Sequence, residues 1–119
     1  MGINSTEVAY GFGQMGSILH ESNDGTADAG VTIDGELKAR GGVFVAITFL
    51  EDSVFDGGAS GLVPEDTDYF PGTGTSSPGI DANGGSPTDD VVFPKGITIY
   101  GRWTEFNLSS GKCLAYIGY

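Results

Sequence analysis

The chain has 119 residues, of which 16 are acidic and 5 are basic, so its formal net charge is −11. This length suits one domain, residues 1–119, and so acidic a surface repels nucleic-acid phosphates and anionic membranes. The single cysteine excludes an intrachain disulfide, and with it the class of disulfide-stapled secreted proteins. No apolar run approaches the roughly 20 residues of a transmembrane helix, and the start lacks the features of a signal peptide. We therefore expect an ordinary cytosolic start, no nucleic-acid partner and no membrane partner.

The N-terminal third of the chain is typical of extended backbone interrupted by glycines. Residues 7–19 are apolar but contain three closely spaced glycines, which disfavour a helix. Residues 21–30 predict a loop, because they are polar and contain an Asp-Gly turn signal. Residues 31–40 predict a short strand, a turn at Asp34-Gly35 and then more strand, which together could form a hairpin.

Residues 43–50, VFVAITFL, carry the clearest signal for a strand. All eight are apolar or β-branched, and two glycines precede them. Strict alternation gives two faces: Val43, Val45, Ile47 and Phe49 on one, and Phe44, Ala46, Thr48 and Leu50 on the other. Because both faces are largely apolar, we predict a central strand that is buried on both sides.

The middle of the chain predicts a long connection. Residues 51–70 are acidic with scattered aromatic side chains, and residues 71–88 contain one large apolar residue, Ile80. We predict a Gly-, Ser- and Pro-rich loop or excursion over residues 59–89. Order is expected to resume at residues 90–94.

The apolar side chains of residues 97–108 do not alternate as they would in one regular strand. Large apolar side chains occupy both parities, namely Ile97, Ile99 and Trp103 on one and Phe106 and Leu108 on the other. Either this strand is buried on both faces, or a bulge near Thr104-Glu105 changes its register. Gly101 falls on the face of Trp103, where it leaves room for the indole ring or a neighbouring backbone.

The last residues predict a return strand. Residues 109–112, SSGK, predict a four-residue hairpin loop, after which Cys113, Ala115, Ile117 and Tyr119 alternate with a second set of side chains. No amphipathic helix longer than two turns is expected anywhere. The predicted fold class is therefore all-β, a small β-sandwich or partly open barrel with a long Gly/Ser/Pro-rich loop.

Few residues could carry out catalysis. His20 and Cys113 are the only histidine and cysteine, and they could act as a pair only if the fold joined them. Cys113 begins an apolar strand, which predicts a small buried side chain, and His20 is expected at the surface or an edge. Two nitrogen and sulfur ligands cannot complete a structural zinc site. We predict a non-enzymatic protein with no catalytic residue, no metal site and no cofactor.

Oxygen-rich clusters keep calcium binding open as an alternative. They are Asn23, Asp24 and Asp28; Glu65, Asp66 and Asp68; and Asp81 with Asn83. None has the spacing of an EF-hand loop, so we expect solvated acidic loops.

Three stretches together resemble small virion structural proteins of marine tailed bacteriophages, cyanophages among them. They are residues 10–17 (YGFGQMGS), 43–58 (VFVAITFLEDSVFDGG) and 93–119 (FPKGITIYGRWTEFNLSSGKCLAYIGY). In that group an early F-G-Q-x-G-S precedes a V-A-I-T-F-L-type strand, a G-x-T-I-Y-G-R-W/Y-T segment and a return strand close to A-Y-x-G. The match covers about half of the chain in the same order. These motifs describe packing and turns, so they indicate membership better than role.

The resemblance implies a capsid decoration (cement) protein that stabilises contacts between neighbouring capsid subunits. Its expected location is the capsid surface of the virion, and the host cytoplasm during assembly. Its expected partners are the major capsid protein or other virion proteins, and further copies of itself in a cyclic homo-oligomer, which we predict to be a trimer. The alternative is a small tail- or fibre-associated module that binds a host receptor or a glycan.

Aromatic side chains are the candidates for contact with those partners, because they are enriched where protein interfaces are buried. The predicted interface residues are Phe12, Phe55, Tyr69, Phe70 and Tyr119. Each of them could instead belong to the hydrophobic core.

Overall fold

The computed structural model describes residues 15–22, 30–57, 61–74 and 84–118, and these residues form mainly β-strands. The elements are β1 (Gly16–Glu21), β2 (Val31–Thr32), α2 (Gly35–Ala39), β3 (Val43–Phe49), β4 (Val54–Phe55), β5 (Leu62–Pro64), β6 (Thr98–Phe106), β7 (Leu108–Ser110) and β8 (Lys112–Gly118). The predicted all-β class is confirmed.

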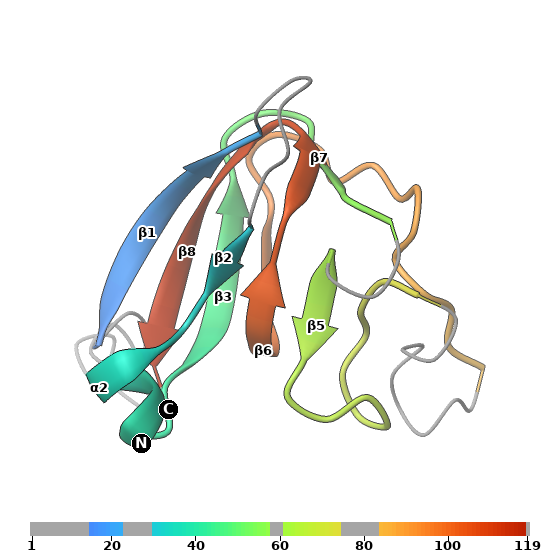
Figure 1. Ribbon diagram of the computed structural model, residues 1–119. Coiled ribbons are helices and arrows are strands. Elements are labelled where there is room, and N and C mark those ends of the chain that lie inside the picture. Colours follow the sequence, from blue (N-terminus) through green and yellow to red (C-terminus); the bar gives the residue numbers. More distant parts are fainter. Residues whose placement is uncertain (1–14, 23–29, 58–60, 75–83, 119) are drawn as a thin grey trace, which may run out of the picture.

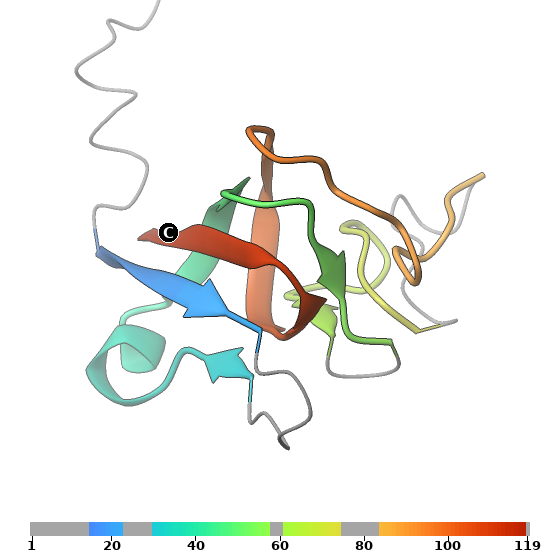
Figure 2. The same ribbon diagram turned by 90° about the horizontal axis from the view of Figure 1, so that it is seen from above.

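One antiparallel sheet curls into a nearly closed barrel (Figures 1 and 2). Its strand order is β1-β8-β3-β6-β2, and β5 also pairs with β6. The short strands β4 and β7 form a separate two-stranded sheet. Of the two architectures that the sequence left open, the structure therefore takes the barrel.

Strand β3 lies between β6 and β8, and six of its seven residues are buried, as predicted for a central strand. The predicted division of its side chains into two faces is wrong at one point. Phe44 belongs to the same core cluster as Ile47 and Phe49. The pairing of β3 shifts by one residue between Phe44 and Ala46, which turns Phe44 onto the core side.

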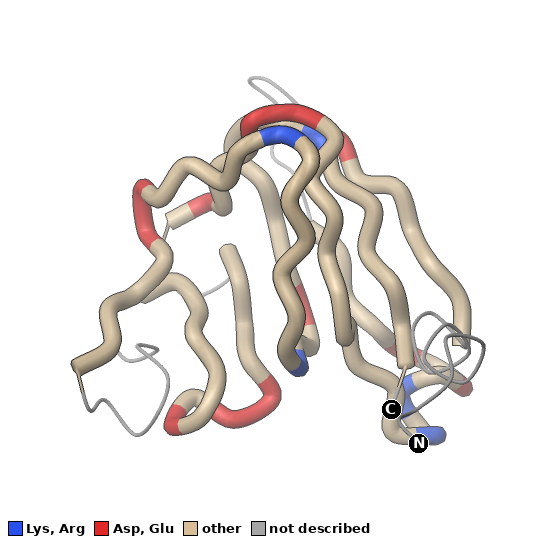
Figure 3. The backbone as a smooth tube through the Cα atoms, turned by 180° about the vertical axis from the view of Figure 1, so that it is seen from behind, with Lys and Arg blue, Asp and Glu red and all other residues tan. Residues whose placement is uncertain are grey.

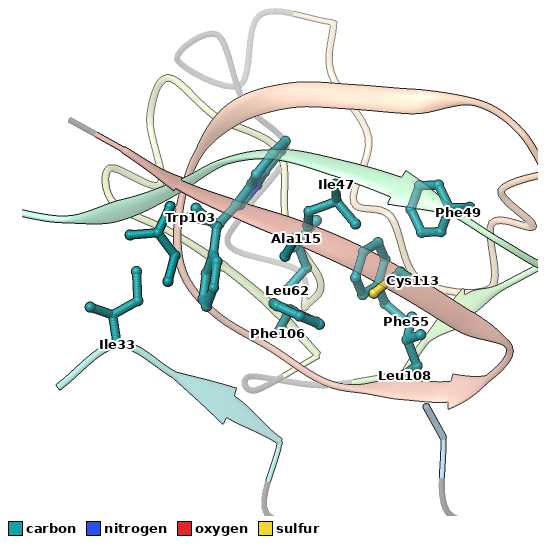
Figure 4. Close-up of a cluster of buried hydrophobic side chains, with 12 residues drawn as sticks. Ile33, Ile47, Phe49, Phe55, Leu62, Trp103, Phe106, Leu108, Cys113 and Ala115 are labelled. Carbon is teal, nitrogen blue, oxygen red and sulfur yellow. The ribbon is translucent and has the colours of Figure 1, made fainter. Parts of the chain in front are cut away.

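Of the two alternatives that the sequence left open for β6, burial on both faces or a bulge near Thr104-Glu105, the structure has the bulge. Opposite the adjacent residues Val63 and Pro64 of β5, strand β6 presents Glu105 and then Trp103, so Thr104 is the extra residue. This shift lets Trp103 and Phe106 enter the same core cluster in spite of their opposite parity (Figure 4). Gly101 also has its predicted role, because a Cβ atom there would lie 2.7 Å from Cη2 of Trp103.

Residues 35–39 correct the prediction of a strand after the Asp34-Gly35 turn, because they form the short helix α2. Gly35 has a φ of 61°, a left-handed conformation that ends the extended backbone there. Glu36, Leu37, Lys38 and Ala39 then follow, all of them good helix formers. Leu37 packs against the core cluster, which holds the helix on the barrel.

The predicted excursion over residues 59–89 is only partly a loop, because Leu62–Pro64 form β5. Residues 75–83 lie outside the described part of the chain, but both flanks are attached to the barrel. The indole Nε1 of Trp103 donates to the carbonyl oxygen of Pro71 at 2.8 Å. The amide of Gly74 donates to Oδ2 of Asp89, also at 2.8 Å, which ties one flank of the excursion to the other.

Candidate interaction surface

His20 and Cys113 are directly opposite each other on β1 and β8, a pairing that the sequence could not predict. Both point into the barrel, where His20 is 8% exposed and Cys113 is fully buried. The imidazole contacts the ring of Phe106 edge-on, with 5.3 Å between the two ring centroids. Its Nε2 accepts a hydrogen bond from the amide of Leu108. The prediction that Cys113 is buried is confirmed, whereas His20 lies on an edge strand but not at the surface.

Burial raises the pKa of the Cys113 thiol from 9.0 to about 12, so the sulfur remains protonated at neutral pH. The thiolate is the nucleophilic form of cysteine, and no thiolate forms under these conditions. The two side chains therefore pack inside the barrel, with the Cys113 thiol in its protonated form at neutral pH.

Two results should follow for Cys113. Iodoacetamide at about pH 8 should leave the native protein unmodified and alkylate it fully in denaturant, as measured by mass spectrometry. The unfolded thiol ionises above pH 9.0 and the folded one only near pH 12, so the free energy of unfolding should fall between these values. The part of this loss that comes from the thiol should approach about 1.4 kcal/mol per pH unit. It should be absent from Cys113→Ala, which keeps every tyrosine and therefore any contribution of the tyrosines to the pH dependence. Rapid alkylation of the native protein would contradict this burial.

The acidic clusters do not converge on an ion within the described residues, where no three His, Cys, Asp or Glu side chains are placed to hold a metal. Glu65 instead accepts two hydrogen bonds from Arg102, at 2.8 and 2.9 Å. These bonds lower the pKa of the Glu65 carboxyl and raise that of the Arg102 guanidinium. Asp66 accepts a hydrogen bond from the amide of Asp68. The clusters around Asp24 and Asp81 lie outside the described part of the chain.

A hollow of about 260 Å³ lies between β2, α2 and β6. It is lined by Thr32, Ile33, Lys38, Gly42, Thr104 and Glu105. This lining contains no histidine or cysteine, and hence no nucleophile with an adjacent imidazole base.

Three of the five predicted interface residues lie in the described part of the chain, and these three do not form one surface. Phe55 is 1% exposed and packs edge-on against the rings of Phe49 and Phe106, so it is a core residue and its prediction as a surface contact is wrong. Tyr69 is 60% exposed and Phe70 is half-buried. Phe12 and Tyr119 lie outside the described residues.

The structure instead reveals a patch without charge on the outside of the barrel, which we name the uncharged sheet face. Two rows of paired residues cross strands β1, β8, β3 and β6 in that order. The first row is Leu19, Leu114, Thr48 and Thr98, and the second is Ser17, Tyr116, Ala46 and Tyr100.

The alternation of the strands turns these eight side chains outward. Their neighbours along the strands, among them Ile47, Ile99 and Ala115, belong to or pack against the core cluster. Tyr100 is 64% exposed and Leu19 is 59% exposed, whereas Ala46 between them is 2% exposed. The two threonines of the first row join their hydroxyl groups in a hydrogen bond of 2.8 Å. The face therefore presents apolar and hydroxyl groups only.

One oppositely charged pair lies at each end of this face. Lys112 lies 4.0 Å from Glu21 at one end of the strands, and Arg102 is bonded to Glu65 at the other. Asp and Glu gather mostly on the loops and strand ends, which leaves the middle of the strands largely free of charge (Figure 3). The face thus carries no charge although the chain has a net charge of −11.

In comparisons with known proteins, no family model matches this chain, no curated protein matches it in sequence and no solved structure matches it in fold. Within the described residues, the structure contains no helix with the length and apolar character that a membrane crossing requires.

Proposed function

We propose that this chain is a non-enzymatic structural protein of a bacteriophage virion, a capsid decoration protein that binds neighbouring protein subunits through the uncharged sheet face. The observation that supports this proposal most is the face itself, eight outward side chains without a charge on a chain of net charge −11. The resemblance of residues 10–17, 43–58 and 93–119 to virion proteins supplies the setting.

The composition of the face suits a protein contact. Buried interface cores are depleted in charged residues and enriched in aromatic ones, and this face has two tyrosines and two leucines. Burying an exposed side chain such as Leu19 stabilises a complex by about 1.5–3 kcal/mol. The ion-paired rim adds little net charge that a partner would have to match.

The acidic remainder of the chain favours the outside of a capsid over its interior. Packaged DNA is a dense array of negative charge, and a body of net charge −11 is repelled by it. A decoration protein instead contacts capsid subunits, where apolar burial and shape decide the affinity. No observation in the described residues favours the glycan-binding alternative.

Purified particles of the phage that encodes this chain test the proposal. Mass spectrometry should find the protein in intact particles, and an antibody against it should label their surface. When phage lacking the gene is supplied with Tyr100→Glu, the particles should lack the protein. Tyr69→Glu is the matched control, because Tyr69 is a similarly exposed tyrosine outside the face. Absence of the unmodified protein from particles would overturn the virion role.

A further inference from the structure

We propose that the uncharged sheet face binds the same face of a second copy of this chain, which gives a two-fold dimer with the two sheets packed against each other. This inference deepens the proposed function, because it names the partner of the same surface. It requires that this surface is a protein contact, but it does not require that the protein belongs to a virion.

Charge is the first argument for a second copy. A strongly basic partner would be drawn to the acidic loops, where most of the carboxylates lie, and not to a face without charge (Figure 3). Two copies that each carry −11 repel each other over most of their surfaces. On this face they can meet without opposing like charges, because its rim residues Glu21 and Glu65 are paired with Lys112 and Arg102.

The distribution of large and small side chains over the face is the second argument. Of its two central strands, β3 contributes the small side chains Ala46 and Thr48, and β8 contributes the large side chains Leu114 and Tyr116. Its two outer strands carry the protruding side chains, Leu19 on β1 and Tyr100 on β6. A two-fold axis parallel to the strands lays β1 of one copy over β6 of the other within the same row, so that Leu19 lies over Thr98 and Tyr100 over Ser17. Packed sheets lie about 10 Å apart, a spacing that such side chains fill.

An isologous contact of this kind closes at two copies. The trimer predicted from the sequence would therefore need a second and different contact. The dimer could itself bridge two capsid subunits, since its halves present the same surfaces in opposite directions.

Light scattering on the purified full chain at about 50 mM and about 500 mM NaCl tests the inference. The expected mass is that of two copies, and the dimer should dissociate less at high salt, because salt screens the repulsion between two acidic bodies. Tyr100→Glu should weaken association by about a hundredfold or more, since it places two new carboxylates in the contact. Tyr69→Glu, which adds the same charge outside the face, should behave as the unmodified protein. Both substitutions are at exposed positions, and circular dichroism should confirm that both variants fold.

Three outcomes would overturn the inference: a monomer at every salt and protein concentration, association that weakens as salt rises, or equal effects of the two variants. The result also separates this inference from the proposed function. A monomer that is found in particles, and is excluded from them by Tyr100→Glu, would reject the dimer and keep the virion role. A dimer that is absent from particles would reject the virion role and keep the dimer.

Discussion

Replacing Gly111 with alanine should lower the free energy of unfolding by about 3–5 kcal/mol, the sum of backbone strain and overpacking. Gly111 forms the turn between β7 and β8 with a φ of 97°, a left-handed conformation that side chains disfavour. An added Cβ would also collide with Oγ of Ser53 and lie 2.7 Å from the carbonyl oxygen of Asp52. Ser53 cannot yield, because it is fully buried and its hydroxyl donates to the carbonyl oxygen of Glu51.

Gly96→Ala is the matched control for this substitution. Gly96 has nearly the same φ, 94°, but nothing lies within 4 Å of an added Cβ. The free energy of unfolding of Gly96→Ala should therefore fall only by the cost of the backbone strain, about 1–2 kcal/mol. Urea titrations followed by circular dichroism measure both losses. Equal losses would mean that the contact between the Gly111 turn and Ser53 is not tight in solution.

That turn also replaces the predicted four-residue loop over residues 109–112, because Leu108–Ser110 belong to β7.

Gly101→Ala should cost about 1–3 kcal/mol, and the cost should depend on Trp103. An added Cβ would lie 2.7 Å from Cη2 and 2.8 Å from Cζ2 of the indole, so the ring would have to move. Trp103 is 1% exposed and its Nε1 is bonded to the carbonyl oxygen of Pro71. Moving the ring therefore disturbs both the core and the flank of the excursion.

A double-mutant cycle isolates this contact. Trp103→Phe should itself cost about 2–3 kcal/mol, because it loses ring atoms from the core and the hydrogen bond to Pro71. In the Trp103→Phe background, Gly101→Ala should cost less than about 0.5 kcal/mol, since the phenyl ring is shorter. Circular dichroism is the appropriate probe, because the chain has no other tryptophan for fluorescence. An unchanged cost in the two backgrounds would show that Gly101 does not accommodate the indole.

Local patterns in the sequence predicted the all-β class and the central strand of the fold. The apolar run at residues 43–50 predicted the central strand. The opposite parity of Trp103 and Phe106 indicated either a bulge near Thr104-Glu105 or burial on both faces, and the structure has the bulge. Other features lacked a local signal. The shift between Phe44 and Ala46 occurs within an uninterrupted apolar run, so no residue type marks it. Strand β5 is short and surrounded by polar residues, which hid it in the predicted excursion.

The candidate site could not be predicted because it depends on long-range pairing. Its rows join β1 to β8, with Leu19 opposite Leu114, and those residues are far apart in the sequence. The same pairing brings His20 and Cys113 together. Aromatic residue type alone does not separate Phe55, which is in the core, from Tyr100, which is exposed on the face. One signal was available, since Thr98 and Tyr100 alternate with the apolar residues Ile97 and Ile99, and this alternation marks outward positions without charge.

Hydroxyl-radical footprinting of the assembled protein tests the central claim, that the uncharged sheet face is a protein contact. Tyr100 and Tyr69 are 64% and 60% exposed in the single chain, so they should be oxidised at similar rates when the protein is dilute. In the concentrated dimer or in intact particles, the account predicts that Tyr100 is protected while Tyr69 continues to react. Equal oxidation of the two tyrosines in the assembled state would contradict it.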